Sequence, residues 1–114
     1  MRVNVLFVCS RNQWRSPTAE KVFSTHESVA VRSRGTSRAA RQKLTSGDIN
    51  WADIVLVMEQ KHKQRITAEF PGESKYRTIC VLDIPDEYRY MDEELIDILQ
   101  DCVPPLISNA LPGN

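Results

Sequence analysis

Residues Val3 to Pro17 read Val-Asn-Val-Leu-Phe-Val-Cys-Ser-Arg-Asn-Gln-Trp-Arg-Ser-Pro, an apolar run followed directly by a polar loop. The run Val3 to Val8 is rich in β-branched residues and is interrupted only by Asn4, which is typical of a strand buried on both faces of a parallel sheet. Ser16-Pro17 indicates the start of a helix, because a proline in the first helical turn has no N–H to lose. The stretch therefore predicts a strand, a loop and a helix.

The rest of the chain continues this alternation of strands and helices. Further apolar runs predict strands over 29–32, 53–58 and 78–82. Helices are expected over 16–26, 45–51, 60–70 and 92–99. Whether the last helix continues past Cys102 is left open, and Pro104-Pro105 are expected to disturb any such continuation. The pattern predicts a three-layer α/β fold, in which a four-stranded parallel sheet carries helices on both faces. At 114 residues, we expect a single domain spanning 1–114.

Composition limits the possible classes of function. Lys plus Arg and Asp plus Glu are both 15, which argues against a nonspecific nucleic-acid binder because such binding needs surplus cations. The charge is uneven, however, with basic residues concentrated in 2–43 and acidic ones in 83–101, so an anionic ligand should be attracted to the first half. For any single arginine, a solvated helix face explains the charge equally well.

The chain is expected to be cytoplasmic and to need no metal or cofactor. No run has the length of a secretory signal or a membrane span, so no membrane partner is expected. The three cysteines, Cys9, Cys80 and Cys102, are too widely spaced for a zinc site and odd in number for a disulfide framework. A reducing compartment also suits a reactive thiol. The oligomeric state is left open.

The loop from Cys9 to Ser16 carries the candidate chemistry. Ligands of parallel sheets bind at the carboxyl ends of the strands, where this loop lies, and its backbone N–H groups and the helix N-terminus can form an anion site. Arg15 can add a bidentate fork to two phosphate oxygens. The same positive field favours the thiolate of Cys9, a nucleophile suited to displacement at phosphorus. The expected phosphate-binding residues are Ser10, Arg11, Asn12, Gln13, Trp14 and Ser16.

The competing interpretation is that Cys9 is only a small buried apolar residue at a strand end, as most free cysteines are. The pattern Cys-x5-Arg is weak by itself. The strand before it and the Ser-Pro helix start after it favour the nucleophile.

These residues resemble the low-molecular-weight protein tyrosine phosphatase family, whose first strand is followed by Cys-x-Gly-Asn-x-Cys-Arg-Ser-Pro-x-Ala-Glu. This chain reads Cys-Ser-Arg-Asn-Gln-Trp-Arg-Ser-Pro-Thr-Ala-Glu over 9–20. The resemblance continues in 31–36, 40–42, 51–59 and 84–88, which is most of the chain. It implies hydrolysis of a phosphorylated protein or aryl phosphate through a cysteinyl-phosphate intermediate.

The chain departs from the family pattern at three places. Arg11 stands where the family has a permissive glycine, and Trp14 stands where it has a second loop cysteine that can protect the nucleophile. The stretch between Thr36 and Ala40 is shorter than in the family, so a supporting histidine carried there has no counterpart. The two histidines of this chain, His26 and His62, are expected to be surface residues.

A leaving phenolate needs a proton, and the acidic segment after the fourth predicted strand can supply it. The resemblance assigns this role to Asp86, with Asp83 as the alternative, and it places Tyr88 as an aromatic wall for the substrate ring. Tyr90 and Trp14 are possible partners of that wall. The segment could instead be a solvated acidic loop that caps the next helix at Asp92.

Two other functions stay open. An arsenate reductase uses a similar loop but needs two further cysteines close together, whereas Cys80 and Cys102 lie far apart in the sequence. A non-catalytic module could hold a phosphate or phosphopeptide without hydrolysing it, which the changes at Arg11 and Trp14 would allow.

Overall fold

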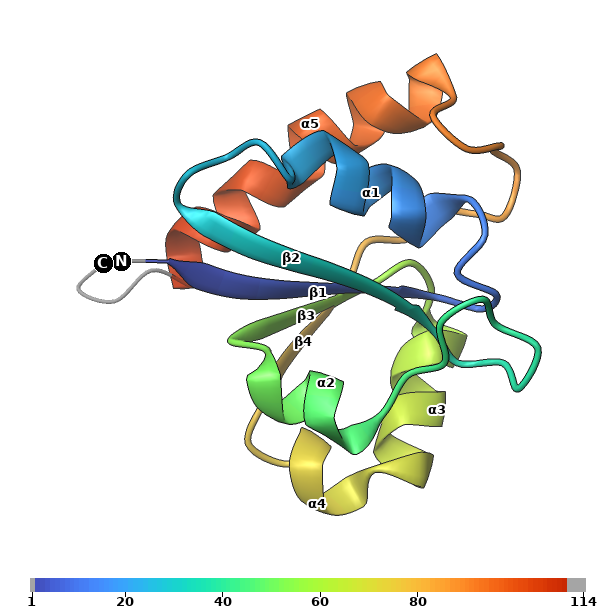
Figure 1. The fold of residues 1–114 in the computed structure, drawn as a ribbon, viewed down its shortest axis with the longest axis vertical. Coiled ribbons are helices and arrows are strands. Elements are labelled where there is room, and N and C mark those ends of the chain that lie inside the picture. The colour runs from blue at the N-terminus through green and yellow to red at the C-terminus, as the bar shows by residue number, and fades with distance from the viewer. Residues whose placement is uncertain (1, 111–114) are drawn as a thin grey trace.

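The computed structural model describes residues 2–110 and contains a four-stranded parallel sheet in the order β2-β1-β3-β4 (Figure 1). The strands are β1 (Val3–Cys9), β2 (Val29–Gly35), β3 (Ile54–Val57) and β4 (Thr78–Val81). The four strands predicted from the apolar runs are confirmed, although β2 extends three residues further than expected.

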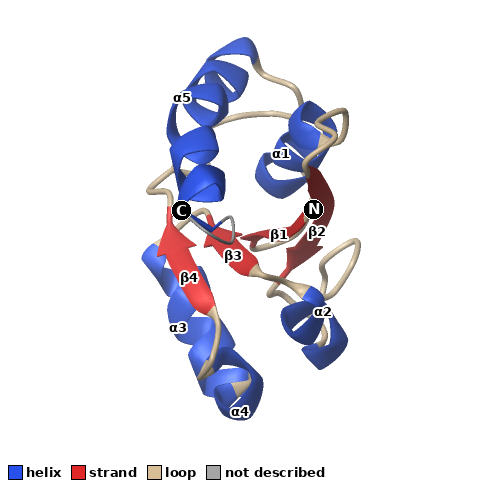
Figure 2. Cartoon of the chain, turned by 90° about the vertical axis from the view of Figure 1, so that its left-hand side faces the viewer, coloured by secondary structure: helices blue, strands red, loops and turns tan. Residues whose placement is uncertain are grey.

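Helices cover both faces of the sheet, as predicted (Figure 2). One face carries α1 (Arg15–Phe23) and α5 (Glu93–Ala110). The other carries α2 (Ser46–Trp51), α3 (Gln60–Glu69) and the single turn α4 (Pro71–Ser74). The fold is therefore the expected three-layer α/β arrangement.

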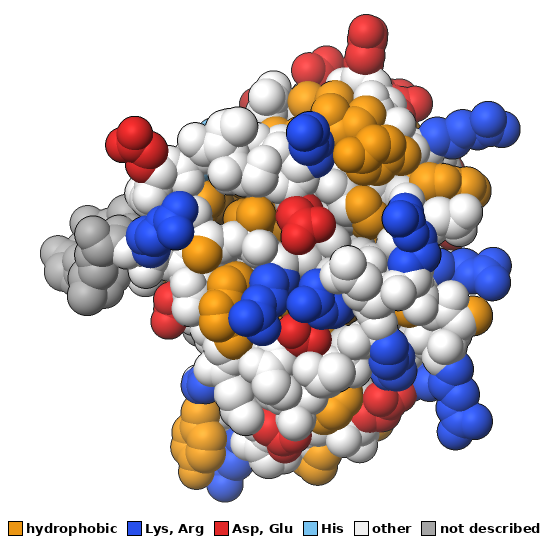
Figure 3. All heavy atoms as spheres, viewed as in Figure 1, with side chains coloured by type: hydrophobic (Ala, Val, Ile, Leu, Met, Phe, Trp, Pro, Cys, Tyr) orange, Lys and Arg blue, Asp and Glu red, His pale blue; other side chains and the backbone are white. Residues whose placement is uncertain are grey.

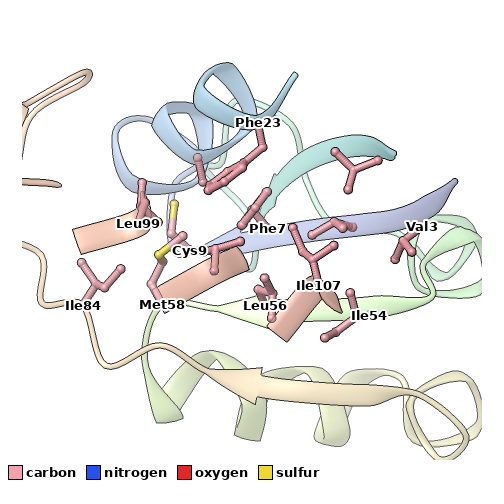
Figure 4. Packing of buried hydrophobic residues seen from close by; sticks show 14 of the residues in the cluster. Val3, Phe7, Cys9, Phe23, Ile54, Leu56, Met58, Ile84, Leu99 and Ile107 are labelled. Carbon is pink, nitrogen blue, oxygen red and sulfur yellow. The ribbon is translucent and has the colours of Figure 1, made fainter. Parts of the chain in front are cut away.

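Strand β1 packs apolar side chains on both faces of the sheet, in the alternation that a central strand requires. Val5, Phe7 and Cys9 belong to the core beneath α1 and α5, where Phe7 stacks on Phe23 of α1 (Figure 4). Leu6 and Val8 belong to the second core, beneath α2 and α3. The alternation places the Cys9 side chain on the α1 side of the sheet.

Helix α5 departs from the sequence expectation. It continues through Pro104 and Pro105 to Ala110, so the prediction that these prolines disturb the helix was wrong. Both prolines are exposed, while Val103 and Ile107 are buried in the core, and this apolar stripe keeps the segment on the sheet despite the lost N–H groups. Within residues 2–110, no helix is both long and apolar enough to cross a membrane.

The strand order creates a crevice at the end of β1. The connection from β1 leads through α1 to β2 on one side, and the next connection returns through α2 to β3 on the other side. Loops that leave β1 and β3 therefore diverge to opposite faces, and ligands of open α/β sheets bind in such a crevice. The loop that begins at Cys9 lies there.

Candidate active site

The loop after β1 is braced from behind by the short segment that follows β2. Three backbone N–H groups of this segment donate to backbone carbonyls of the loop. The pairs are Thr36 to Cys9 at 3.0 Å, Ser37 to Ser10 at 2.9 Å and Arg41 to Arg11 at 3.0 Å. The segment that is short relative to the family thus supports the loop directly.

Gly35 makes this close approach possible. A Cβ at this position would lie 2.6 Å from the Ser10 carbonyl oxygen and 2.9 Å from the Asn12 nitrogen, which is too close for any side chain. The glycine of the Arg34-Gly35-Thr36 motif is therefore required by the backbone of the loop.

Asn12 holds the turn of the loop from the inside. Its φ of 54° lies in the left-handed region, which asparagine tolerates better than most residues. The buried side-chain amide donates to Ser16 Oγ at 2.9 Å and to Ser33 Oγ at 3.0 Å. Arg11, at the family's glycine position, does not have a positive φ, so the arginine fits this loop without backbone strain.

Cys9 and Ser16 contact each other beneath the loop. Cys9 is only 3% exposed, and its Sγ lies 3.0 Å from Ser16 Oγ. Ser16 Oγ accepts a hydrogen bond from Asn12, and its one O–H points between two acceptors, the Cys9 sulfur at 3.0 Å and the Arg34 carbonyl at 3.4 Å. The sulfur is the nearer of the two acceptors.

Arg15 is anchored by two acceptors. The side chain is 2% exposed, and its Nη1 donates to Glu59 Oε1 at 2.5 Å and to the Ile84 carbonyl at 2.8 Å. Burial of the Glu59 carboxyl acts to raise its pKa, but the hydrogen bond and charge of Arg15 outweigh burial and hold that pKa below its ordinary value. Glu59 is therefore a carboxylate that fixes the guanidinium.

A small cavity of about 30 Å³ lies over the loop. It is lined by Cys9, Ser10, Arg11, Gln13, Trp14, Arg15 and Asp86. Asn12 and Ser16, the other two residues expected to bind phosphate, are buried and are not among the residues that line the cavity. The structure thus brings the predicted nucleophile, cation and acid to one cavity.

The two candidate acids are separated by the structure. Asp86 lines the cavity, with Oδ1 3.7 Å from Arg15 Nε and a side chain that is 57% exposed. Asp83 lines a different hollow with Glu59 and Pro85. The geometry favours Asp86 over Asp83.

Aromatic side chains surround the cavity differently from the sequence expectation. Trp14 lines it and is 38% exposed. Tyr88, predicted as the wall, is half-buried against the core beneath α5 and is not among the residues that line the cavity. Tyr90 borders a separate groove between α1 and β2. Trp14 is therefore the aromatic residue best placed beside a substrate.

His62 was missed by the sequence analysis. It was predicted to be a surface residue, but it is 1% exposed, whereas His26 is exposed as predicted. His62 Nδ1 accepts from the backbone N–H of Glu59 at 3.0 Å, so Nε2 carries the proton and donates to Ser10 Oγ at 2.8 Å. A histidine does support the loop, from the start of α3. The available signal was its position just after β3, at the same sheet edge as Cys9.

The pH dependence of stability should depend on His62. Burial, followed by the charge of Arg15, lowers the pKa of His62 from 6.5 to about 4. Between pH 4 and 6.5 the unfolded chain binds a proton at His62 that the folded chain does not. The contribution of neutral His62 to the free energy of unfolding is therefore complete above pH 6.5 and is lost as the pH falls towards 4. We expect His62→Gln to flatten this part of the stability curve, measured by urea unfolding at each pH. His26→Gln, at the exposed histidine, should leave the curve unchanged; the same flattening there would contradict the assignment.

Comparison with solved structures gives a consistent match. The chain superimposes on the YwlE arginine phosphatase of Geobacillus stearothermophilus with a TM-score of 0.68 and 24% identity, covering 93% of this chain and 88% of that one. The tyrosine phosphatase Wzb of Escherichia coli K30 gives a TM-score of 0.66 and 25% identity, with coverages of 96% and 94%. A low-molecular-weight phosphotyrosine phosphatase of Vibrio cholerae O395 gives 0.66 and 21%, with coverages of 86% and 88%.

No model of a known protein family and no curated protein matches the chain. The structural matches nevertheless define the class: this is an α/β protein with the fold of the low-molecular-weight protein tyrosine phosphatases. The resemblance stated from the sequence is confirmed. Among residues 2–110, no three His, Cys, Asp or Glu side chains are grouped so that they could hold a metal ion.

Proposed function

We propose that this protein is a phosphatase that hydrolyses phosphomonoesters through a cysteinyl-phosphate intermediate, with phosphotyrosine or another aryl phosphate as substrate. The observation that carries the proposal is the single cavity that joins Cys9, Arg15 and Asp86 above a helix N-terminus. The matched solved structures, described as tyrosine and arginine phosphatases, support the same reaction class.

In the first step, Cys9 Sγ attacks phosphorus and the bond between phosphorus and the leaving oxygen breaks. The electron pair goes to that oxygen, which takes the proton of Asp86. Arg15 and the loop N–H groups stabilise the charge on the equatorial phosphate oxygens. Glu59 holds Arg15 in place for this task and does not itself need to contact the substrate.

In the second step, water attacks the cysteinyl phosphate and the Asp86 carboxylate takes the proton from the water. The bond between sulfur and phosphorus breaks, and Cys9 leaves as a thiolate. Ser16 Oγ, 3.0 Å from the sulfur, donates a hydrogen bond to this leaving thiolate. Inorganic phosphate is then released from the cradle of loop N–H groups.

The preference for an aryl substrate follows from Trp14, whose ring offers an apolar face at the cavity. The structure gives less support to arsenate reduction. Cys80 lies in β4 and Cys102 in α5, and neither lines the cavity at Cys9. A disulfide relay from Cys9 therefore has no neighbouring thiol in the cavity.

The proposal is tested by turnover of p-nitrophenyl phosphate together with alkylation of the thiols. We expect hydrolysis, and labelling of Cys9 by iodoacetate at mildly acidic pH that phosphate or vanadate prevents, because thiolate and anion share the loop. Burial raises the pKa of Cys102, so this thiol should label slowly and serve as an internal reference. Equal labelling of all three cysteines, or labelling that phosphate does not affect, would contradict the proposal.

Asp86→Asn tests the assignment of the acid. Asparagine preserves the shape of the side chain but cannot supply a proton. Phosphoenzyme formation from esters of phenols with a high pKa, which are poor leaving groups, should therefore slow by roughly 100-fold. Esters of nitrophenols should be affected much less, because a nitrophenolate departs without protonation. Single-turnover rates over a series of aryl phosphates measure how steeply the rate falls as the pKa of the leaving phenol rises. Asp83→Asn is the matched control. If its rate depends more steeply on the leaving-group pKa than that of Asp86→Asn, Asp83 is the acid.

A further inference from the structure

A second hollow adjoins the candidate active site on the side of α3. Its volume is about 430 Å³, and it is lined by Ser10, Thr36, Ser37, Arg38, Lys61, His62 and Arg65. Ser10 borders both this hollow and the cavity over Cys9. A molecule bound at Cys9 can therefore extend past Ser10 into the second hollow.

The lining of this hollow is cationic and contains no carboxylate. Arg38 is exposed and makes no side-chain hydrogen bond or ion pair within residues 2–110. Lys61 is exposed and lies 3.9 Å from Glu59, a carboxylate already bonded to Arg15. Arg65 is paired with Glu69 on the helix surface. The charges of Arg38 and Lys61 are therefore not fully neutralised by other side chains of the protein.

The surface around the hollow extends this charge. Figure 3 shows several Lys and Arg side chains on the side of the molecule where β1 and β2 end in Figure 1. Arg11, beside Ser10 in the loop, is another exposed arginine without a side-chain partner among the described residues. A chain with equal numbers of acidic and basic residues thus concentrates unpaired cations beside its candidate active site.

We propose that this hollow is a second anion subsite, which selects substrates with a phosphate or carboxylate group near the phosphoryl group that is cleaved. The inference rests on the proposed function and adds its substrate class: acidic or multiply phosphorylated peptides. Arg38 and Lys61 bind the second anion, and Ser10 separates the two anionic groups. Oriented cations of this kind raise both the affinity and the encounter rate of acidic ligands.

Binding to the Cys9→Ser variant tests the subsite without turnover. Three phosphotyrosine peptides are compared by calorimetry: one with glutamine flanks, one with glutamate flanks, and one with a second phosphotyrosine. We expect either or both acidic peptides to bind roughly tenfold more tightly than the neutral one, as charged hydrogen bonds imply. If only the peptide with the second phosphotyrosine binds more tightly than the neutral peptide, the ligand of the subsite is a phosphate. If the peptide with glutamate flanks also binds more tightly, the subsite accepts either anion. Adding Arg38→Gln and Lys61→Gln should remove the gain and leave the neutral peptide's affinity unchanged.

Lys75→Gln removes one charge at the start of β4, at the opposite edge of the sheet, and should preserve the gain. Equal affinities for all peptides, no binding of any peptide, or a gain that survives the double substitution would overturn the subsite. Hydrolysis of p-nitrophenyl phosphate by the unaltered protein is measured in parallel. Hydrolysis without acidic preference would overturn the subsite alone, whereas acidic preference without hydrolysis would overturn the proposed enzyme and retain the subsite.

Discussion

Cys9→Ser is expected to reduce hydrolysis of p-nitrophenyl phosphate by roughly 10⁴-fold or more, the scale found when a nucleophile is removed. A serine hydroxyl in this loop has no base to take its proton, and it is a much weaker nucleophile than a thiolate at neutral pH. The substitution changes one buried atom, so the loop and its contacts to Ser16 and Thr36 should persist.

The Cys9→Ser experiment also separates an enzyme from a phosphate-binding module. Phosphate binding should survive in the variant, measured by calorimetry, while steady-state turnover disappears. Cys102→Ser, at the half-buried thiol of α5, is the matched control and should retain activity. If unaltered protein and Cys9→Ser bind phosphopeptides equally and neither hydrolyses them, the chain is a binding module.

The sheet could be predicted from the sequence because its central strands are buried on both faces. Val3 to Val8 and Ile54 to Val57 are continuous apolar runs, and such runs have few alternatives in a short α/β chain. The cysteine loop was equally predictable, since its chemistry lies in consecutive residues. The cavity contains Cys9, Arg15 and Asp86 together, as the sequence analysis had proposed.

Features that depend on contacts between distant residues could not be predicted. His62 looked like an isolated polar residue on a helix: its position after β3 places it at the sheet edge of Cys9, but the local sequence does not specify the contact with Ser10, 52 positions away. Glu59 likewise had no assigned role until its bond to Arg15 was seen. The continuation of α5 through Pro104 was missed for a related reason: tertiary burial of Val103 and Ile107 outweighs the local cost of proline.

The orientation of Arg15 determines the second large effect that we expect. Nη1 is fully used by Glu59 and Ile84, while Nε lies 3.7 Å from Asp86 at the cavity. The guanidinium is therefore held at one end by structural acceptors and directs its remaining donors towards the cavity. A lysine ammonium is a single point charge and cannot serve the anchor and a phosphate oxygen with the same planar fork.

Arg15→Lys should therefore lower kcat/KM for p-nitrophenyl phosphate by about 10² to 10³-fold, because donors to the charge that develops in the transition state are lost. The ion pair with Glu59 can persist, so the free energy of unfolding should change much less than it would for a neutral substitution. Steady-state kinetics and urea unfolding measure the two quantities. Arg11→Lys is the matched control, because Arg11 lines the same cavity but is exposed and lacks a side-chain partner among the described residues, and it should change kcat/KM only a few-fold. Near-normal turnover in Arg15→Lys would mean that the Arg15–Glu59 pair only supports the fold and that the loop N–H groups alone stabilise the transferred phosphoryl group.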